Sequence, residues 1–350
     1  MHHGEEIASD YTGRSVSMNC EKTKYADRAR TIAAGLPVAR APGFDAATRN
    51  AAGAVRMRCL TLVLLLAAPL AHAHEVQAEN AAAFPGWGGE PWVLTLLALS
   101  AGLYLAGAWR LWRRSRGGRP ALLRQGGMFA IGWLALAGAL ASPLDGMGSQ
   151  LFSAHMLQHE LLMLVAAPLL VLGRPLAVWL WALPGRSAVA SAVRHPLVRL
   201  PWQWLTMPMV SWLLHAVALW VWHVPRLFEG ALASNAMHSW QHASFLASAL
   251  LFWWAVLGDG GERGRRSGAM LYLFTTMLHT GALGALLTWS TVPWYPAYAG
   301  TVGLYGFDLL EDQQLGGLIM WIPGALAYLF AGLVLAARWL KSDPRVRGSP

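Results

Sequence analysis

The chain has 350 residues, of which 55% are hydrophobic and only 13% are charged, and 19 of them are tryptophan. This composition excludes an ordinary soluble globular protein and favours a membrane protein. The formal net charge of +9 would suit a nucleic-acid-binding protein if the basic residues formed one patch, so their placement distinguishes the two classes. Cys20 and Cys59 make no zinc or disulfide motif. A metal site must therefore use other ligands.

The N-terminal part of the chain contains a secretory signal that starts well inside the sequence. Arg58 supplies a positive charge, Leu60–Leu70 is a short apolar run, and residues 71–73 read Ala-His-Ala, as at a signal-peptide cleavage site. A cytoplasmic tail joined to an uncleaved anchor is the alternative. We expect a spurious or disordered extension at 1–56, a signal peptide at 57–73, a short periplasmic segment at 74–91, a membrane domain at 92–340 and a cytoplasmic tail at 341–350.

Apolar runs near the 20 or so residues that a bilayer requires then recur with polar breaks between them. They predict an all-α fold, a polytopic membrane helical bundle with seven transmembrane helices. The predicted helices cover residues 92–111, 126–142, 154–172, 205–224, 238–257, 269–289 and 315–337. The proline-interrupted segment Pro175–Trp204 is interpreted as an amphipathic stretch on the membrane surface.

Basic residues gather in alternate loops, which predicts the orientation of the helices. They are Arg113, Arg114, Arg116, Arg119 and Arg124 after the first helix, Arg174, Arg186, Arg194 and Arg199 after the third, Arg263, Arg265 and Arg266 after the fifth, and Lys341, Arg345 and Arg347 in the tail. The opposite side holds only Arg226. We therefore expect the N-terminus outside, the C-terminus in the cytoplasm, and a location in a bacterial inner membrane. Basic residues spread in this way form no groove for nucleic acid.

Two pairs of histidines open predicted helices on the outer side of the membrane. His155 and His159 begin the third helix, and His238 and His242 begin the fifth. Residues four apart lie on one face of an α-helix, about one turn from each other, so each pair can hold one metal ion. His223, at the end of the fourth helix, reaches the same depth from the other direction.

Methionines beside these histidines indicate which metal to expect. Met156 lies within the first pair and Met163 extends the same helix face by a turn. Imidazole with thioether is a ligand set that suits copper, especially Cu(I), in an oxidising compartment. The pattern predicts a copper site formed by His155, His159, His238, His242, His223, Met156 and Met163. Packing is the alternative role for each of them taken singly.

Other ionisable residues suggest further roles. His215 and His279 lie deeper in the fourth and sixth helices and could be axial ligands of a haem, relay sites for protons or hydrogen-bonded core residues. Glu160 could support a ligating imidazole or face a neighbouring helix. Asp145, Glu229, Asp308, Glu311 and Asp312 are placed in outer loops, where they form either an acidic entrance for a cation or a solvated surface.

No nucleophile motif, phosphate loop or dinucleotide fingerprint is present in the sequence. We therefore expect a protein that is not an enzyme. Besides copper handling, three functions stay open at this point: a haem-binding membrane redox protein, a copper transporter, and a scaffold without a metal.

Two motifs resemble a known family. They are His155-Met156-Leu157-Gln158-His159, leading into Leu161–Gly173 and Pro175, and the run Asp312-Gln313-Gln314-Leu315-Gly316-Gly317 that continues to Gly324. Together they are similar to the seven-helix CtaG-type cytochrome c oxidase assembly proteins, over about Phe84 to Leu340. The resemblance implies a role in making an active haem-copper oxidase, by handling copper for it. It implies an oxidase subunit as partner, with a periplasmic copper carrier as a further candidate.

Overall fold

The computed structural model describes residues 89–258 and 263–341, which belong to one compact unit, Leu66–Pro350. The predicted extension, the signal peptide, residues 74–88 of the predicted periplasmic segment and residues 342–350 of the tail lie outside the described residues. Within the described part of the chain all regular structure is helical. The all-α prediction is therefore confirmed for these residues.

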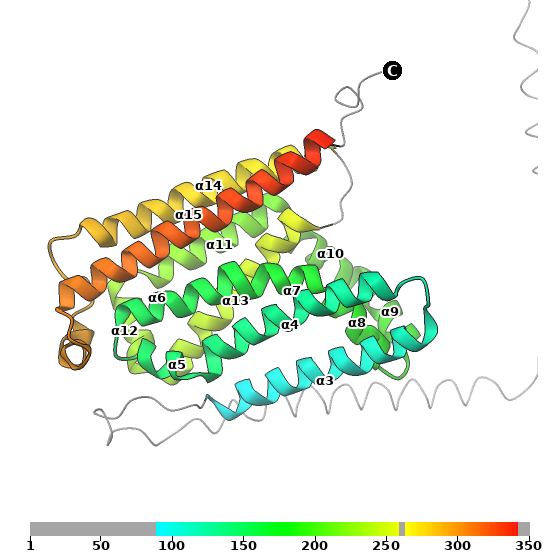
Figure 1. Cartoon of the computed structure of the whole chain (residues 1–350), viewed down its shortest axis with the longest axis horizontal. Helices are drawn as coiled ribbons and strands as arrows, with labels where there is room; N and C mark the ends of the chain where they lie inside the picture. The colour runs from blue at the N-terminus through cyan, green and yellow to red at the C-terminus, as the bar shows by residue number, and fades with distance from the viewer. Residues whose placement is uncertain (1–88, 259–262, 342–350) are drawn as a thin grey trace, which may run out of the picture. The chain divides into compact units, whose positions relative to one another are not determined.

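Thirteen α-helices follow one another along the described residues, with a π-helical turn and two short 3₁₀ helices among them (Figure 1). They are α3 (Pro91–Arg114), α4 (Arg119–Ala141), α5 (Pro143–Gly148), α6 (Phe152–Glu160), the π-helix η2 (Leu161–Ala166), α7 (Ala167–Gly173), α8 (Pro175–Ala182), α9 (Arg186–Arg194), α10 (Pro196–Leu205), α11 (Pro208–Trp222), α12 (Pro225–Ala233), α13 (Asn235–Leu257), α14 (Arg263–Trp289), η3 (Pro296–Gly300), η4 (Val302–Tyr305) and α15 (Leu309–Lys341).

Each of the seven predicted ranges is largely helical, but fewer helices meet the requirements for crossing a membrane. Four are long and apolar enough, at Pro91–Arg114, Phe152–Gly173, Gly268–Trp289 and Leu309–Leu340. The pair α10 and α11 would make a fifth if the two are one broken span. Helices α4 and α13 have 23 residues each, or about 34 Å of helix, which is long enough to cross a bilayer. They are not among the four candidates because their polar residues lower their mean hydropathy. The count of seven spans, and the orientation, stay predictions.

The predicted fourth span, 205–224, differs from the helix that forms there. Helix α11 has only 15 residues, and the preceding α10 meets it at a bend of 66°. Pro208 at the start of α11 explains the break, because proline has no N–H for the helix and disfavours helical backbone in the residue before it. Part of the segment that we interpreted as lying on the membrane surface forms α10, which leads into α11 through this bend.

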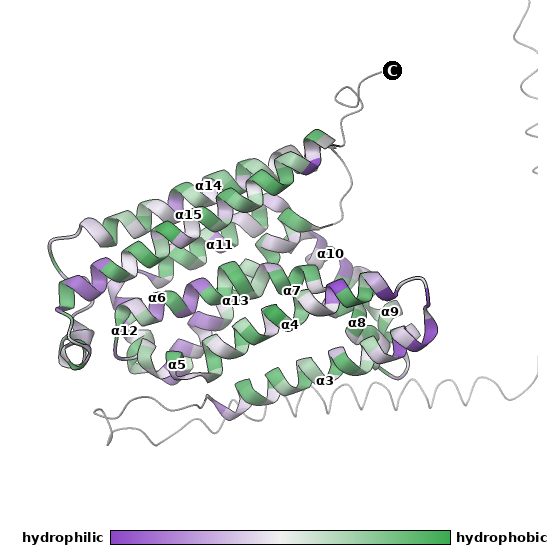
Figure 2. Cartoon of the chain, viewed as in Figure 1, coloured by the Kyte–Doolittle hydropathy of each residue, from purple (hydrophilic) through white to green (hydrophobic). Residues whose placement is uncertain are grey.

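Exposed side chains on the long helices are strongly apolar. Leu105 on α3 is 70% exposed and Phe330 on α15 is 71% exposed, and green apolar residues predominate along these helices in Figure 2. A soluble protein rarely leaves extended apolar faces uncovered, whereas lipid tails cover them without cost. The described helices therefore fit a membrane protein.

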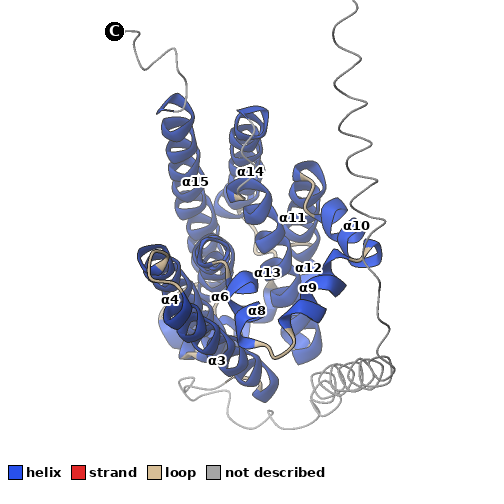
Figure 3. Cartoon of the chain, turned by 90° about the vertical axis from the view of Figure 1, so that its right-hand side faces the viewer, coloured by secondary structure: helices blue, strands red, loops and turns tan. Residues whose placement is uncertain are grey.

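The helix formed by α6, η2 and α7 lies between several others and is the most buried of the four candidate spans. It packs against α4 on one side and against α13 and α15 on others, as Figure 3 shows in a view along the helices. The largest hydrophobic cluster includes Leu162 and Met163 from η2 together with Phe252 of α13 and Tyr328 of α15. This central position explains why the polar residues at its N-terminal end are buried.

Helix α3 depends on a close approach to α8 at Gly107. A Cβ atom there would overlap the carbonyl oxygen of Val178, so Gly107→Ala is expected to lower the unfolding free energy by about 1–3 kcal/mol through overpacking. Gly102→Ala on the same helix is the matched control, because nothing lies within 4 Å of its Cβ position. Thermal unfolding of the two variants in detergent measures the difference. Equal melting temperatures would contradict the packing of α3 on α8.

Candidate metal centre

The start of α6 is held by a residue from the far end of the sequence. Leu151 precedes the helix and offers no side-chain cap, but the carboxyl oxygens of Asp312 on α15 accept hydrogen bonds from the backbone N–H groups of Phe152, at 2.7 Å, and Ser153, at 3.1 Å. These groups are among the four N–H donors that a helix start leaves without partners. Asp312 thereby sets the position of the turn that carries His155.

A π-helical turn, η2, begins directly after Glu160 and ends at α7. Pro168, near the start of α7, cannot donate a backbone hydrogen bond, which favours a local widening of the helix. Such turns occur frequently next to functional sites because they change the direction of the side chains before them. The turn follows the His155–Glu160 segment immediately.

On the opposite side of the site, α13 presents the second pair of histidines. The hydroxyl oxygen of Ser234 accepts a hydrogen bond from the N–H of Met237 at 3.4 Å and caps this helix. The next two turns carry His238 and His242. His223 lies at the C-terminal end of α11, so three separate helices contribute imidazoles.

The five histidines predicted to lie on the outer side, which are His155, His159, His223, His238 and His242, come together. Their ring centroids are 4.3 Å apart for His155 and His159, 4.1 Å for His238 and His242, 5.3 Å for His155 and His238, 5.4 Å for His159 and His242, and 6.4 Å for His159 and His223. All but His238 are buried, with exposed fractions of 0–7%. Each ring therefore has at least one other imidazole beside it, and four of the five rings are shielded from water.

Several ring nitrogens in this cluster have no hydrogen-bond partner. They are Nε2 of His155, His223, His238 and His242, and both nitrogens of His159. The Nδ1 atoms of His155 and His223 lie 3.1 Å from the Gly148 carbonyl oxygen and 2.7 Å from the Leu219 carbonyl oxygen. A carbonyl oxygen only accepts, so these Nδ1 atoms carry the protons and leave the Nε2 lone pairs available. Buried polar atoms without partners are costly, and a metal ion would satisfy them together.

The ligand atoms form two groups that share one residue. His155, His159 and His242 each have one within 4.8 Å of the others, and so do Asp145, His238 and His242. We call the first the inner triad and the second the outer triad. The inner triad is fully buried, whereas Asp145 and His238 are partly exposed. The Gln158 side-chain amide donates to Asp145 Oδ1 at 2.6 Å and to the Ala139 carbonyl oxygen at 2.7 Å, so the acid is held in place.

A cavity of about 370 Å³ reaches the outer triad. Its lining includes Asp145, His238 and His242, with Glu90 and Trp92 from the start of α3. No residue of the inner triad other than His242 belongs to the lining. A small cation in this cavity would therefore meet the outer triad before the inner one.

Two tyrosines from the segment between α14 and α15 hold backbone atoms beside the histidines. Tyr295 donates its hydroxyl proton to the carbonyl oxygen of His223 at 2.9 Å, and Tyr298 donates to that of Gly148 at 3.0 Å. Burial raises the pKa of both phenols, and the neighbouring Glu229 adds to the rise for Tyr295 and Asp312 to that for Tyr298. Both stay protonated and keep these bonds at neutral and moderately alkaline pH.

The two predicted methionine ligands lie in apolar surroundings. Met156 is fully buried in a cluster with Phe152, Phe228 and Met320, and its Cγ lies 3.2 Å from the Cβ position of Gly316 on α15. Met163 belongs to the largest hydrophobic cluster. The structure thus brings the five outer histidines together and places the methionines in the packing around them.

The deeper residues form a separate polar group. His215 Nδ1 lies 3.2 Å from the Ser248 hydroxyl, and His215 Nε2 lies 3.5 Å from the Tyr328 hydroxyl. His279 has two nitrogens without hydrogen-bond partners and packs edge-on against Trp212 at 5.9 Å. Glu160 has one unpartnered oxygen, which lies 3.6 Å from the Cβ position of Gly324 on α15. Of its two predicted positions, Glu160 takes the one that faces a neighbouring helix.

Sequence reasoning missed the residues that support the site. Asp312 was expected in an outer loop, but it is 0% exposed and lies inside α15, where it caps α6. Gln158 and Gln241 are 0% exposed beside the histidines. Their positions three residues after His155 and three after His238 put them within one helical turn of the ligands, which is the one signal that could have identified them.

The described helices and the buried cluster of imidazoles together define a helical membrane protein with a candidate metal centre at one end of its helices. The model of the family described as cytochrome c oxidase caa3 assembly factor (Caa3_CtaG) matches residues 102–342. The chain belongs to this family.

Curated relatives are found in mycobacteria. The chain is 29% identical over 252 residues to the uncharacterized proteins Mb0105 of Mycobacterium bovis and MT0111 of Mycobacterium tuberculosis, a match that covers 65% of this chain and 37% of each relative. It is 27% identical over 226 residues to ML1998 of Mycobacterium leprae, covering 61% of this chain and 34% of the relative. The chain thus spans little more than a third of the length of these relatives. No solved structure matches it.

Proposed function

We propose that the protein is an assembly factor for a cytochrome c oxidase that binds copper at the histidine cluster, on the predicted periplasmic face, and supports loading of a haem-copper oxidase with the metal. The family provides the link to oxidase assembly. The observation that carries the copper assignment is the set of buried imidazole nitrogens without partners on three converging helices. Neutral imidazole suits copper, and no thiol is needed.

The arrangement of ligands fits an ion that is held and later released. Copper is here a cargo, so the site must bind it without enclosing it permanently. The two triads share His242, so an ion can move between them by exchanging ligands one at a time while His242 stays bound. The outer triad, which meets the cavity, is the access position, and the inner triad is the holding position. An oxidase subunit is the proposed recipient.

Replacing Asp145 tests this route. Asp145→Asn removes the one acidic ligand of the outer triad but leaves the inner triad intact, so copper loading is expected to slow by about tenfold while the final copper content stays the same. Asp308→Asn is the matched control, because Asp308 is an exposed acid outside both triads. Stopped-flow loading of the purified protein with Cu(I) measures the rates. Equal copper-loading rates in both variants would contradict the proposal that copper enters through the outer triad.

The haem and transport alternatives make different predictions. A haem between His215 and His279 would give a Soret band in the absorption spectrum of the purified protein, and we expect none. A transporter would move copper across a sealed vesicle, and we expect the protein to retain copper on one face. A scaffold without a metal would keep full function when the outer histidines are replaced.

A further inference from the structure

A second pocket lies at the opposite end of α3 from the histidine cluster. The start of α3 contributes Glu90 and Trp92 to the cavity beside His238. Its last turns, about 20 residues and about 30 Å further along the helix, contribute to a pocket of about 640 Å³. The remaining lining comes from α8, α9 and the turn between them. The two pockets are therefore distinct sites.

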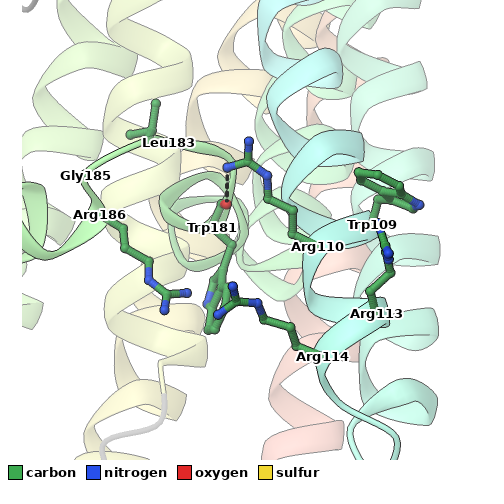
Figure 4. Close-up of a pocket in the computed structure, with 8 residues that line it drawn as sticks. All are labelled: Trp109, Arg110, Arg113, Arg114, Trp181, Leu183, Gly185 and Arg186. Atoms are coloured by element: carbon green, nitrogen blue, oxygen red, sulfur yellow. Dashed lines mark hydrogen bonds between the residues drawn. The ribbon is translucent and has the colours of Figure 1, made fainter.

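The lining of this pocket is rich in arginine and contains no acid. It consists of Trp109, Arg110, Arg113 and Arg114 from α3, together with Trp181, Leu183, Gly185 and Arg186 (Figure 4). The side chains of Arg110, Arg114 and Arg186 gather around Trp181, Arg113 lies over the Trp109 ring at 5.0 Å, and no carboxylate is among the lining residues. Like charges in one pocket repel each other, and an anion bound between them relieves that repulsion.

Contacts with aromatic rings and carbonyl groups hold the arginines in the pocket. Arg114 and Arg186 lie over the Trp181 ring, with guanidinium carbons 5.9 Å and 4.1 Å from its centroid, and Figure 4 shows both beside it. Arg110 donates to the carbonyl oxygens of Trp181 at 3.0 Å and Ala182 at 2.7 Å. Because these side chains are already ordered, less conformational entropy is lost when an anion binds.

The surroundings of the pocket select the kind of anion. It lies at the end of a candidate membrane span, and the neighbouring Leu105 and Trp109 are 70% and 60% exposed. Tryptophan at the end of a span is typical of the headgroup level of a bilayer. We propose that the pocket binds the phosphate headgroup of an anionic phospholipid while the acyl chains lie along the exposed apolar face of α3.

Binding of lipids to the full-length protein tests the proposal. The purified protein in neutral detergent is titrated with dioleoylphosphatidylglycerol, with dioleoylphosphatidylcholine and with inorganic phosphate, and bound molecules are counted by native mass spectrometry. We expect saturable binding of the anionic lipid, and for Arg114→Gln with Arg186→Gln a loss of affinity of about 30-fold. Arg186→Gln alone, at the exposed start of α9, is expected to lose about fivefold, and it replaces the double variant if that one fails to fold.

The matched control is Arg116→Gln with Arg124→Gln. It removes the same charge from two exposed positions, Arg116 between α3 and α4 and Arg124 in the second turn of α4, but neither residue lines the pocket. Unchanged affinity in this control supports the pocket as the site. An equal loss in both double variants would mean that diffuse positive charge attracts the lipid, and this overturns the proposal. Equal affinity for phosphatidylcholine, or displacement of the lipid by millimolar phosphate, would overturn the headgroup assignment.

Discussion

Replacing His155 and His159 together by alanine is expected to remove the holding position for copper, so that the purified protein binds much less copper, and to lower oxidase activity in cells that depend on it. The two residues supply two of the three ligands in the inner triad, and His242 alone cannot hold an ion there. Removal of a residue that only hydrogen-bonds to a metal ligand lowers metal affinity by roughly 10- to 100-fold. The loss of copper affinity in this variant should be larger, because the ligands themselves are removed. Metal analysis of the membrane-extracted protein and oxidase turnover in the same cells measure the two effects.

The matched control replaces His215 and His279 by alanine. This variant also removes two histidines from membrane helices, but neither belongs to a triad, so its copper content is expected to equal that of the unaltered protein. A copper content of the His155→Ala and His159→Ala variant equal to that of the unaltered protein would defeat the copper assignment. Lost oxidase activity with unchanged copper would instead favour a scaffolding role.

Asp312→Ala is expected to have a comparably large effect although Asp312 contacts no metal. It leaves the buried N–H groups of Phe152 and Ser153 without acceptors, which costs about 2–4 kcal/mol of unfolding free energy in total. The first turn of α6 then loses its fixed position, and His155 and His159 lose theirs. We expect a lower melting temperature together with weaker copper binding.

Two further variants separate these effects. Asp312→Asn keeps one side-chain oxygen as an acceptor and should recover part of the stability. Asp308→Asn, at an exposed position just before α15, should leave both stability and copper binding unchanged. If Asp312→Ala bound copper normally at a temperature where it is folded, the link from the cap of α6 to the histidines would be wrong.

Local patterns in the sequence predicted much of the fold. The seven apolar ranges coincide largely with helices, because continuous apolar runs and polar breaks are properties of neighbouring residues. The i, i+4 spacing of His155 and His159, and of His238 and His242, likewise predicts a shared helix face. To predict that these two faces meet, we had to assume that both pairs lie at the same depth in the membrane. That assumption came from the placement of the basic residues in alternate loops.

Contacts between distant segments could not be predicted in the same way. Asp312 and Phe152 are 160 residues apart in the sequence, and no local pattern relates an acid near the start of one helix to the start of another. Tyr298 and Gly148 are 150 residues apart. The bend between α10 and α11 was missed for a different reason, since Pro208 was included in a predicted span instead of being treated as its break.

The coordination of bound copper tests the central claim most directly. X-ray absorption spectroscopy of the purified protein, loaded with one equivalent of Cu(I), reports the ligand atoms around the metal. We expect a first shell of imidazole nitrogens that is lost in the His155→Ala and His159→Ala variant and kept in the His215→Ala and His279→Ala variant. A shell without imidazole, or a spectrum that is the same in both variants, would contradict copper binding by the inner triad.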